Sequence, residues 1–293
     1  MKTSFRAFIK SHPLLSYFAL AFAISWGGML PIIGGPGAIP GTAEETTKLF
    51  PAVYLVTVSG PGLAGLLLTG LAGGWVGLRE LGFRLLKWRV GAGWYAVAFL
   101  ITPLTVMAIL LALSLVSSEF VPGILTTSVR ASLLRLGFLA GLGLGTGLLE
   151  ELGWTGFAVP TLLRLRYGVL STGLIVGFLW GAWHFLSNVW ASGTASGVPL
   201  ALFMPVILFS FLPPYRVLMV WVYARTGSLL VAILMHASLV AFWLISMPRA
   251  IAGVPLVTWY LVWAAALWVV VGAVALVNGW HTWRHPPLRR RAA

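Results

Sequence analysis

The stretch LGFLAGLGLGTGLLEELGWTGF, residues 136–157, decides the fold of this chain. Its first fourteen residues carry no charge, and two adjacent carboxylates, Glu150 and Glu151, follow directly. A carboxylate at membrane depth costs about 3 kcal/mol or more, so an ionisable residue in a membrane span is a candidate for a functional site. The stretch therefore predicts a transmembrane helix that ends in a functional acidic pair.

The composition indicates an integral membrane protein. Of 293 residues, 59% are hydrophobic and 9% are charged, whereas a soluble domain has about 25% charged residues. The net charge of +13 comes from short basic clusters between apolar runs, which is typical of topology signals and contacts with membrane lipids rather than of nucleic-acid binding. Because the chain has no Cys, thiolate metal sites are excluded, and His and Glu remain as plausible metal ligands.

Apolar runs long enough to cross a bilayer, at about 20 residues each, follow one another along the chain. They predict an all-α fold: one polytopic transmembrane domain over residues 1–293, with about eight transmembrane helices. A cleaved signal peptide is the alternative for the first run. The predicted spans are residues 14–33, 49–71, 94–118, 132–151, 167–190, 200–223, 228–247 and 254–277.

The segments between and within the spans have their own signals. Residues 79–89 alternate apolar and basic side chains at helical spacing, which predicts a short amphipathic helix at the membrane interface. Glycines at positions 141, 143, 145 and 147 predict a bare helix face that neighbouring helices approach closely. Gly153, Gly156 and Pro160 indicate a break or re-entrant bend, and Pro213-Pro214 a kink. Loops are expected at residues 34–48, 119–130 and 193–199.

The distribution of bases predicts the orientation in the cell membrane. With eight spans, most bases fall on the side of the chain that holds both termini, and Lys48, Arg130 and Arg249 fall on the other. Bases concentrate in cytoplasmic segments, so we expect cytoplasmic termini and an acidic pair near the cytoplasmic leaflet. The predicted cytoplasmic bases are Lys2, Arg6, Lys10, Arg79, Arg84, Lys87, Arg89, Arg164, Arg166, Arg225, Arg284, Arg289, Arg290 and Arg291.

His184 and His236 are the two imidazoles predicted inside spans, and with the Glu pair they form a set on three spans that we expect to converge on one cavity. Three kinds of chemistry use such a set. A carboxylate can activate a water while imidazoles relay the proton or hold developing charge. Two His and one Glu can bind one divalent metal such as Zn²⁺. A transporter can use the same residue types as a proton relay.

Three separated motifs resemble those of the CPBP family, which includes the type II CAAX prenyl endopeptidases and the Abi bacteriocin-processing or immunity proteins. The motifs cover a core of about residues 147–240. They are Glu150-Glu151-Leu152-Gly153-Trp154-Thr155-Gly156-Phe157, then Trp180-x-x-x-His184, then Tyr223-Ala224-Arg225-Thr226-Gly227-Ser228-Leu229-Leu230 leading to His236-Ala237.

This resemblance implies an intramembrane endopeptidase that cuts a membrane-associated or lipid-modified peptide near the cytoplasmic face. Glu150 would activate water and Glu151 would orient it or complete the polar cluster. His184 would share the proton transfer with Glu150, and His236 would stabilise the tetrahedral intermediate. Glu150, His184 and His236 are the candidate metal ligands, and both metal-assisted and metal-free routes stay open. The alternatives are a non-catalytic scaffold or bacteriocin self-immunity protein and, less favoured, a proton-coupled transporter.

The chain departs from the family motifs at two positions. Thr155 stands where the family usually has Arg, and Val240 stands where it usually has Asn. Two other residues are candidates to replace them: Arg216 would pair with Glu151 unless it extends to the interface, and Asn188 would point its amide into the cavity unless it makes an ordinary interhelical hydrogen bond. We interpret Trp154, Trp180, Trp183 and Trp190 as packing residues and interface anchors.

Overall fold

The computed structural model describes residues 2–192, 197–249 and 251–279, and within them the regular structure is helical. Eight helical segments are long and apolar enough to cross a membrane, as the sequence predicts. A short helix, α1 (Lys2–Ser11), precedes them. The spans are α2 (Pro13–Ile33); α3 (Ala43–Leu85); α4 (Ala92–Ser114); α5 (Val129–Gly153) with η4 (Trp154–Ala158) and α6 (Val159–Arg164); α7 (Val169–Trp183) with α8 (Phe185–Ser192); α9 (Leu200–Phe209) with α10 (Leu212–Thr226); α11 (Leu229–Ser246); and α12 (Gly253–Val277).

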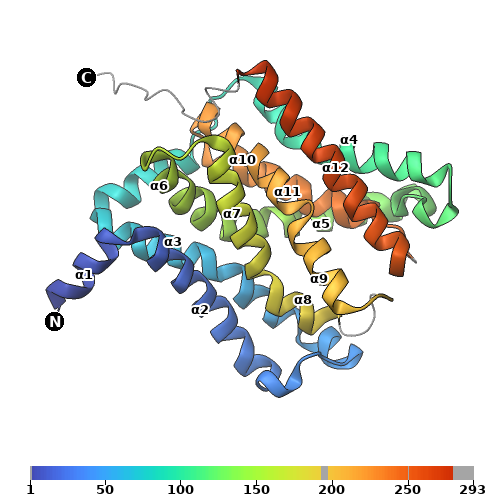
Figure 1. Cartoon of the computed structure of the whole chain (residues 1–293), viewed down its shortest axis with the longest axis horizontal. Coiled ribbons are helices and arrows are strands. Elements are labelled where there is room, and N and C mark those ends of the chain that lie inside the picture. Colours follow the sequence, from blue (N-terminus) through green and yellow to red (C-terminus); the bar gives the residue numbers. More distant parts are fainter. Residues whose placement is uncertain (1, 193–196, 250, 280–293) are drawn as a thin grey trace.

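The helices pack as a bundle whose interior is formed by α7, α10 and α11. Helices α2, α3, α5, α11 and α4 follow one another as packed neighbours, and α7 packs against α10. In Figure 1, α7, α10 and α11 lie between α2 and α3 on one side and α4 and α12 on the other. Segments α10 and α11 are mostly buried, whereas α2, α4 and α12 leave apolar side chains exposed, as contact with lipid requires.

Several predicted boundaries differ from the structure. The loop expected at residues 34–48 ends earlier, because Thr42 and Glu45 form a capping box that starts α3 at Ala43. The break expected after Gly153 is not re-entrant, because η4 is a π-helical turn that continues α5 into α6. Part of the predicted loop, residues 193–196, and the basic tail from residue 280 onward lie outside the described residues.

The predicted interfacial helix is the last part of α3. Gly74 has a non-helical backbone (φ 59°, ψ −152°) that separates this part from the membrane-spanning part. The helix ends at Leu85, four residues before the predicted end. Arg84 Nη1 donates to the Tyr223 hydroxyl at 2.8 Å and Lys87 Nζ donates to the Thr226 carbonyl at 2.6 Å, so this basic segment is attached to the end of α10.

Only alternate members of the glycine pattern in α5 face another helix. A Cβ atom at Gly143 would lie 2.6 Å from the Ala237 carbonyl oxygen, and one at Gly147 would lie 2.8 Å from the Ile233 carbonyl oxygen. Both contacts are with α11. At Gly141 and Gly145 a Cβ would meet nothing within 4 Å. The predicted close approach is therefore confirmed for two of the four positions.

This difference predicts opposite effects of the same substitution. Gly143→Ala forces the α11 backbone to move, and we expect it to lower the free energy of unfolding by about 1–3 kcal/mol. Gly141→Ala is the matched control, two residues away, and we expect it to be neutral or to stabilise by up to about 1 kcal/mol, because Ala favours a helix over Gly. Unfolding in detergent measures both, and equal effects at the two positions would contradict the packing of α5 on α11.

Candidate active site

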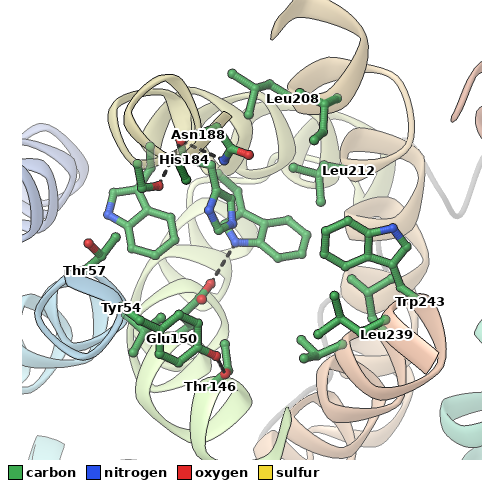
Figure 2. Close-up of a pocket in the computed structure, with 18 of the residues that line it drawn as sticks. Tyr54, Thr57, Thr146, Glu150, His184, Asn188, Leu208, Leu212, Leu239 and Trp243 are labelled. Atoms are coloured by element: carbon green, nitrogen blue, oxygen red, sulfur yellow. Dashed lines mark hydrogen bonds between the residues drawn. The ribbon is translucent and has the colours of Figure 1, made fainter. Parts of the chain in front are cut away.

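One cavity of about 350 Å³ contains three of the four predicted catalytic residues. Glu150, His184 and His236 line it, and most of its other walls are apolar or aromatic. Figure 2 shows the side chains of Glu150 and His184 directed towards the space between the helices. The cavity walls come from α3, α5, α7, α8, α10, α11 and the end of α9. Three helices thus converge as the sequence predicts, but Glu151 does not line the cavity.

Glu150 is held by two indole groups and by no cation. Its side chain is buried, and its Oε2 accepts hydrogen bonds from Trp180 Nε1 at 2.8 Å and from Trp154 Nε1 at 3.3 Å. Its other oxygen, Oε1, has no hydrogen-bond partner among the described residues. A carboxylate fixed through one oxygen has the second oxygen available to accept a proton from a water in the cavity.

Glu151 lies behind the cavity in a buried cluster of charged and polar groups. Arg216 Nη1 donates to Glu151 Oε1 and Oε2 at 2.9 and 2.7 Å. Thr155 Oγ1 donates to Oε2 at 2.5 Å. Both members of the ion pair are fully buried, so Arg216 does not extend to the interface. Position 155 holds no cation, and Glu151 is instead paired with the cation Arg216, with Thr155 as a second donor.

Local breaks in two helices put these partners in place. In η4, the residues four positions after the Glu pair are Trp154 and Thr155, and each donates to one carboxylate. π-Helical turns often occur at functional sites. The span α9–α10 is interrupted at Ser210 and Phe211, which lie just before the Pro pair that the sequence identifies. Arg216 therefore lies near the buried start of α10, with its guanidinium 4.1 Å from the centre of a Trp180 ring.

The two His residues have different environments. His236 Nδ1 is 2.7 Å from Glu151 Oε1. A carboxylate only accepts, so Nδ1 carries the hydrogen and the Nε2 atom of the neutral ring is unprotonated. His184 lies inside its predicted span, which runs from Val169 to Ala191 in the structure, at the junction where α7 ends at Trp183 and α8 begins at Phe185. Its ring packs against Trp183, with 4.6 Å between ring centres, and makes no hydrogen bond to the residues that the structure describes.

The cavity is lined both by Asn188, the candidate replacement for the Asn of the family motif, and by Val240, which stands at that Asn's position. Asn188 Nδ2 donates to the His184 carbonyl at 2.9 Å, so its amide supports the backbone at the break between α7 and α8 (Figure 2). This bond is within one span, which differs from both the interhelical bond and the free amide considered from the sequence. Val240 also lines the cavity, one turn after His236. It presents an apolar side chain where the family usually has Asn.

Sequence reasoning missed three contributors to the site. Trp154 and Trp180, interpreted as packing residues, are the hydrogen-bond donors to Glu150. Their spacing in the sequence could have identified them. Trp154 comes four residues after Glu150 and Trp180 comes four residues before His184, so each lies one helical turn from a candidate catalytic residue. Tyr54 was not identified either: its hydroxyl hydrogen-bonds Thr146, and both residues line the cavity (Figure 2).

The three candidate metal ligands do not form a ligand set. Among the residues that the structure describes, no group of three or more His, Cys, Asp or Glu side chains is placed to hold a metal ion. The contacts of these side chains leave Glu150 Oε1 and His236 Nε2 open, because the two indoles donate to Glu150 Oε2 and Glu151 faces His236 Nδ1. As they are placed in this structure, the three side chains do not assemble the ligand set of a three-ligand Zn²⁺ site.

The comparison with protein families agrees with the motifs. Residues 131–242 match the family described as "Type II CAAX prenyl endopeptidase Rce1-like". The matched segment runs from α5 to α11 and contains Glu150, His184 and His236. The match supports membership of the CPBP family, which the sequence motifs predict, and it suggests a peptidase. The comparison with curated proteins found no match.

Proposed function

We propose that this protein is an intramembrane endopeptidase that hydrolyses a peptide bond of a membrane-associated or lipid-modified peptide by means of a water activated by Glu150. The observation that carries the proposal is the placement of Glu150, His184 and His236 on one largely apolar cavity inside the helix bundle. The family match adds a peptidase as the class of activity. The proposed setting is the cell membrane, with lipids around the bundle and the termini in the cytoplasm.

We assign each residue a role that its contacts support. Glu150 takes a proton from water through the oxygen that the indoles leave free, and the resulting hydroxide attacks the scissile carbonyl carbon. His184, whose ring has no other hydrogen bond within the described chain, passes the proton to the leaving amine. His236, held through Nδ1 by Glu151, presents Nε2 to the oxyanion and donates to it when the ring is protonated. Asn188 supports the His184 backbone.

Glu151 and Arg216 are positioning residues in this proposal. They touch His236 and Trp180 and do not line the cavity. The buried ion pair keeps the ring of His236 and the indole of Trp180 in fixed orientations, and Trp180 in turn fixes Glu150. A reacting group must be held within a fraction of an ångström of its productive geometry, so such support affects rate as well as stability.

Purified protein in detergent, incubated with a library of apolar peptides, tests the proposed function. We expect cleavage by the wild type and none above background by Glu150→Ala or His184→Ala. Glu80→Ala and His12→Ala remove the same groups from exposed positions and should cleave as the wild type does. A different result would favour the non-catalytic scaffold. In that case no form of the protein cleaves a peptide, and wild type and both site variants give the same phenotype in cells.

Metal removal gives an independent prediction. Because the candidate ligands do not form a ligand set, we expect dialysis against 1,10-phenanthroline or EDTA to change the cleavage rate by less than about two-fold, since Glu150 acts on water directly. Metal analysis of the purified wild type and of His236→Ala should give the same content. A stoichiometric metal that is lost in His236→Ala, together with loss of activity on chelation, would contradict the metal-free route.

A further inference from the structure

The two ends of the helix bundle differ in charge. Each span crosses from one end to the other, so one end holds the start of α2 and the other holds the connection from α2 to α3. We call the first the basic end, because ten Lys and Arg residues belong to it in the described chain. These are Lys2, Arg6, Lys10, Arg79, Arg84, Lys87, Arg89, Arg164, Arg166 and Arg225. The opposite end has four, Lys48, Arg130, Arg135 and Arg249.

The cavity extends from the middle of the bundle to the end opposite the basic end. Its deepest lining residues include Glu150, Trp180 and His236, which are at most 2% exposed. Its outermost lining residues are Phe50, 48% exposed near the start of α3, and Ala191, exposed near the end of α8. Both of these residues lie beside connections at the opposite end. No residue from the last turns at the basic end is among the described lining residues.

Towards the basic end the site is closed by close packing. A Cβ atom at Gly62 would lie 2.2 Å from the Leu149 carbonyl oxygen, and one at Gly65 would lie 2.7 Å from Gly153 Cα, so α3 and α5 touch backbone to backbone. Trp154 and Phe157, which follow α5, are buried and pack against Tyr17 of α2. Among the described residues, the cavity lining gives a route to Glu150 from the end opposite the basic end and none from the basic end itself.

We infer that the substrate reaches Glu150 from the non-cytoplasmic side of the membrane. Basic segments are retained in the cytoplasm, which makes the basic end cytoplasmic and puts the mouth of the cavity on the other side. The inference rests on the proposed peptidase function and narrows its substrate to a peptide segment exposed at, or inserted from, the non-cytoplasmic face. It differs from the expectation of cleavage near the cytoplasmic face. That expectation rested on the position of the Glu pair along its helix, whereas the inference rests on the end of the bundle to which the cavity opens.

The absence of Cys from the chain allows a direct test by single-cysteine labelling of the full-length protein in intact cells. The probe is a membrane-impermeant, positively charged methanethiosulfonate. The variants are Ala191→Cys at the mouth, Ser187→Cys on the cavity wall, Leu165→Cys at the basic end (57% exposed) and the buried Ala98→Cys, which does not line the cavity. Ser187→Cys changes one atom of a small side chain, and the labelling does not depend on catalysis.

We expect Ala191→Cys and Ser187→Cys to react when the reagent is added outside the cells. Leu165→Cys should react only after the membrane is made permeable, and Ala98→Cys in neither case. The reverse pattern for Ala191→Cys and Leu165→Cys would overturn the orientation. If Ala191→Cys reacts with the reagent and Ser187→Cys does not, the inference that water and the substrate enter the cavity from this end is overturned. A protein that labels as expected but cleaves no peptide would leave the cavity direction intact and count against the peptidase proposal alone.

Discussion

Glu150→Gln is expected to lower kcat for peptide cleavage by about 10²–10⁴-fold, the usual contribution of a positioned general base. The amide has the shape of the carboxylate and still has an oxygen that accepts the indole hydrogen bonds from Trp154 and Trp180, but it does not take a proton from water. Substrate binding should change little, so KM should stay within a few-fold. Steady-state kinetics with a fluorogenic peptide measure both constants.

A matched control separates this effect from a general loss of structure. Glu45→Gln makes the same chemical change in the exposed capping box of α3, where it should leave kcat unchanged. The melting temperature of Glu150→Gln should lie within a few degrees of the wild type, because the side chain keeps its volume and its donors. A loss of activity in Glu150→Gln that is matched by unfolding, or kcat within ten-fold of the wild type, would contradict the role of Glu150 as the base.

Arg216→Met is expected to have the largest effect on stability. It leaves Glu151 as a buried carboxylate without its cation, and removal of one member of a buried ion pair costs about 3–5 kcal/mol. Thr155 and His236 still donate to Glu151, but neither supplies a permanent charge. Unfolding in mixed micelles measures the loss. We also expect kcat to fall, because the guanidinium no longer supports Trp180.

A double-mutant cycle tests whether the loss comes from the pair itself. Glu151→Gln combined with Arg216→Met removes both charges, and we expect the double variant to be more stable than Arg216→Met alone. Lys48→Met, which removes a base from the opposite end of the bundle, should change stability by less than about 0.5 kcal/mol. Additive losses in the cycle would mean that Arg216 and Glu151 are not coupled and would contradict the buried ion pair.

Most of the architecture was predictable because membrane spans leave a strong signal in the sequence. A run of about 20 apolar residues has few alternatives to a transmembrane helix, and eight such runs are eight spans in the structure. The Arg216–Glu151 ion pair could also be predicted, because a cation and a carboxylate that are buried in the same helix bundle are expected to pair. The family predicted from the motifs is supported by the match at residues 131–242.

The details of the site were less predictable, because hydropathy does not distinguish the faces of an apolar helix. Gly141 and Gly143 look alike in the sequence, but only Gly143 meets α11. Trp180 is an ordinary aromatic residue in an apolar run until its indole is seen to donate to Glu150. The breaks at His184 and in η4 depend on how neighbouring helices satisfy backbone groups, which a single span does not reveal. The catalytic roles stay predictions.

The coupling between Glu150 and His184 in catalysis is the most direct test of the central claim that both take part in one proton transfer, from the water to the leaving amine, in one cavity. The measurement is the single-turnover rate of peptide cleavage by the wild type, Glu150→Gln, His184→Gln and the double variant. Residues that act as a unit lose activity non-additively, so we predict that the double variant is no slower than the slower single variant, within about three-fold. A rate for the double variant equal to the product of the two separate losses would contradict the claim.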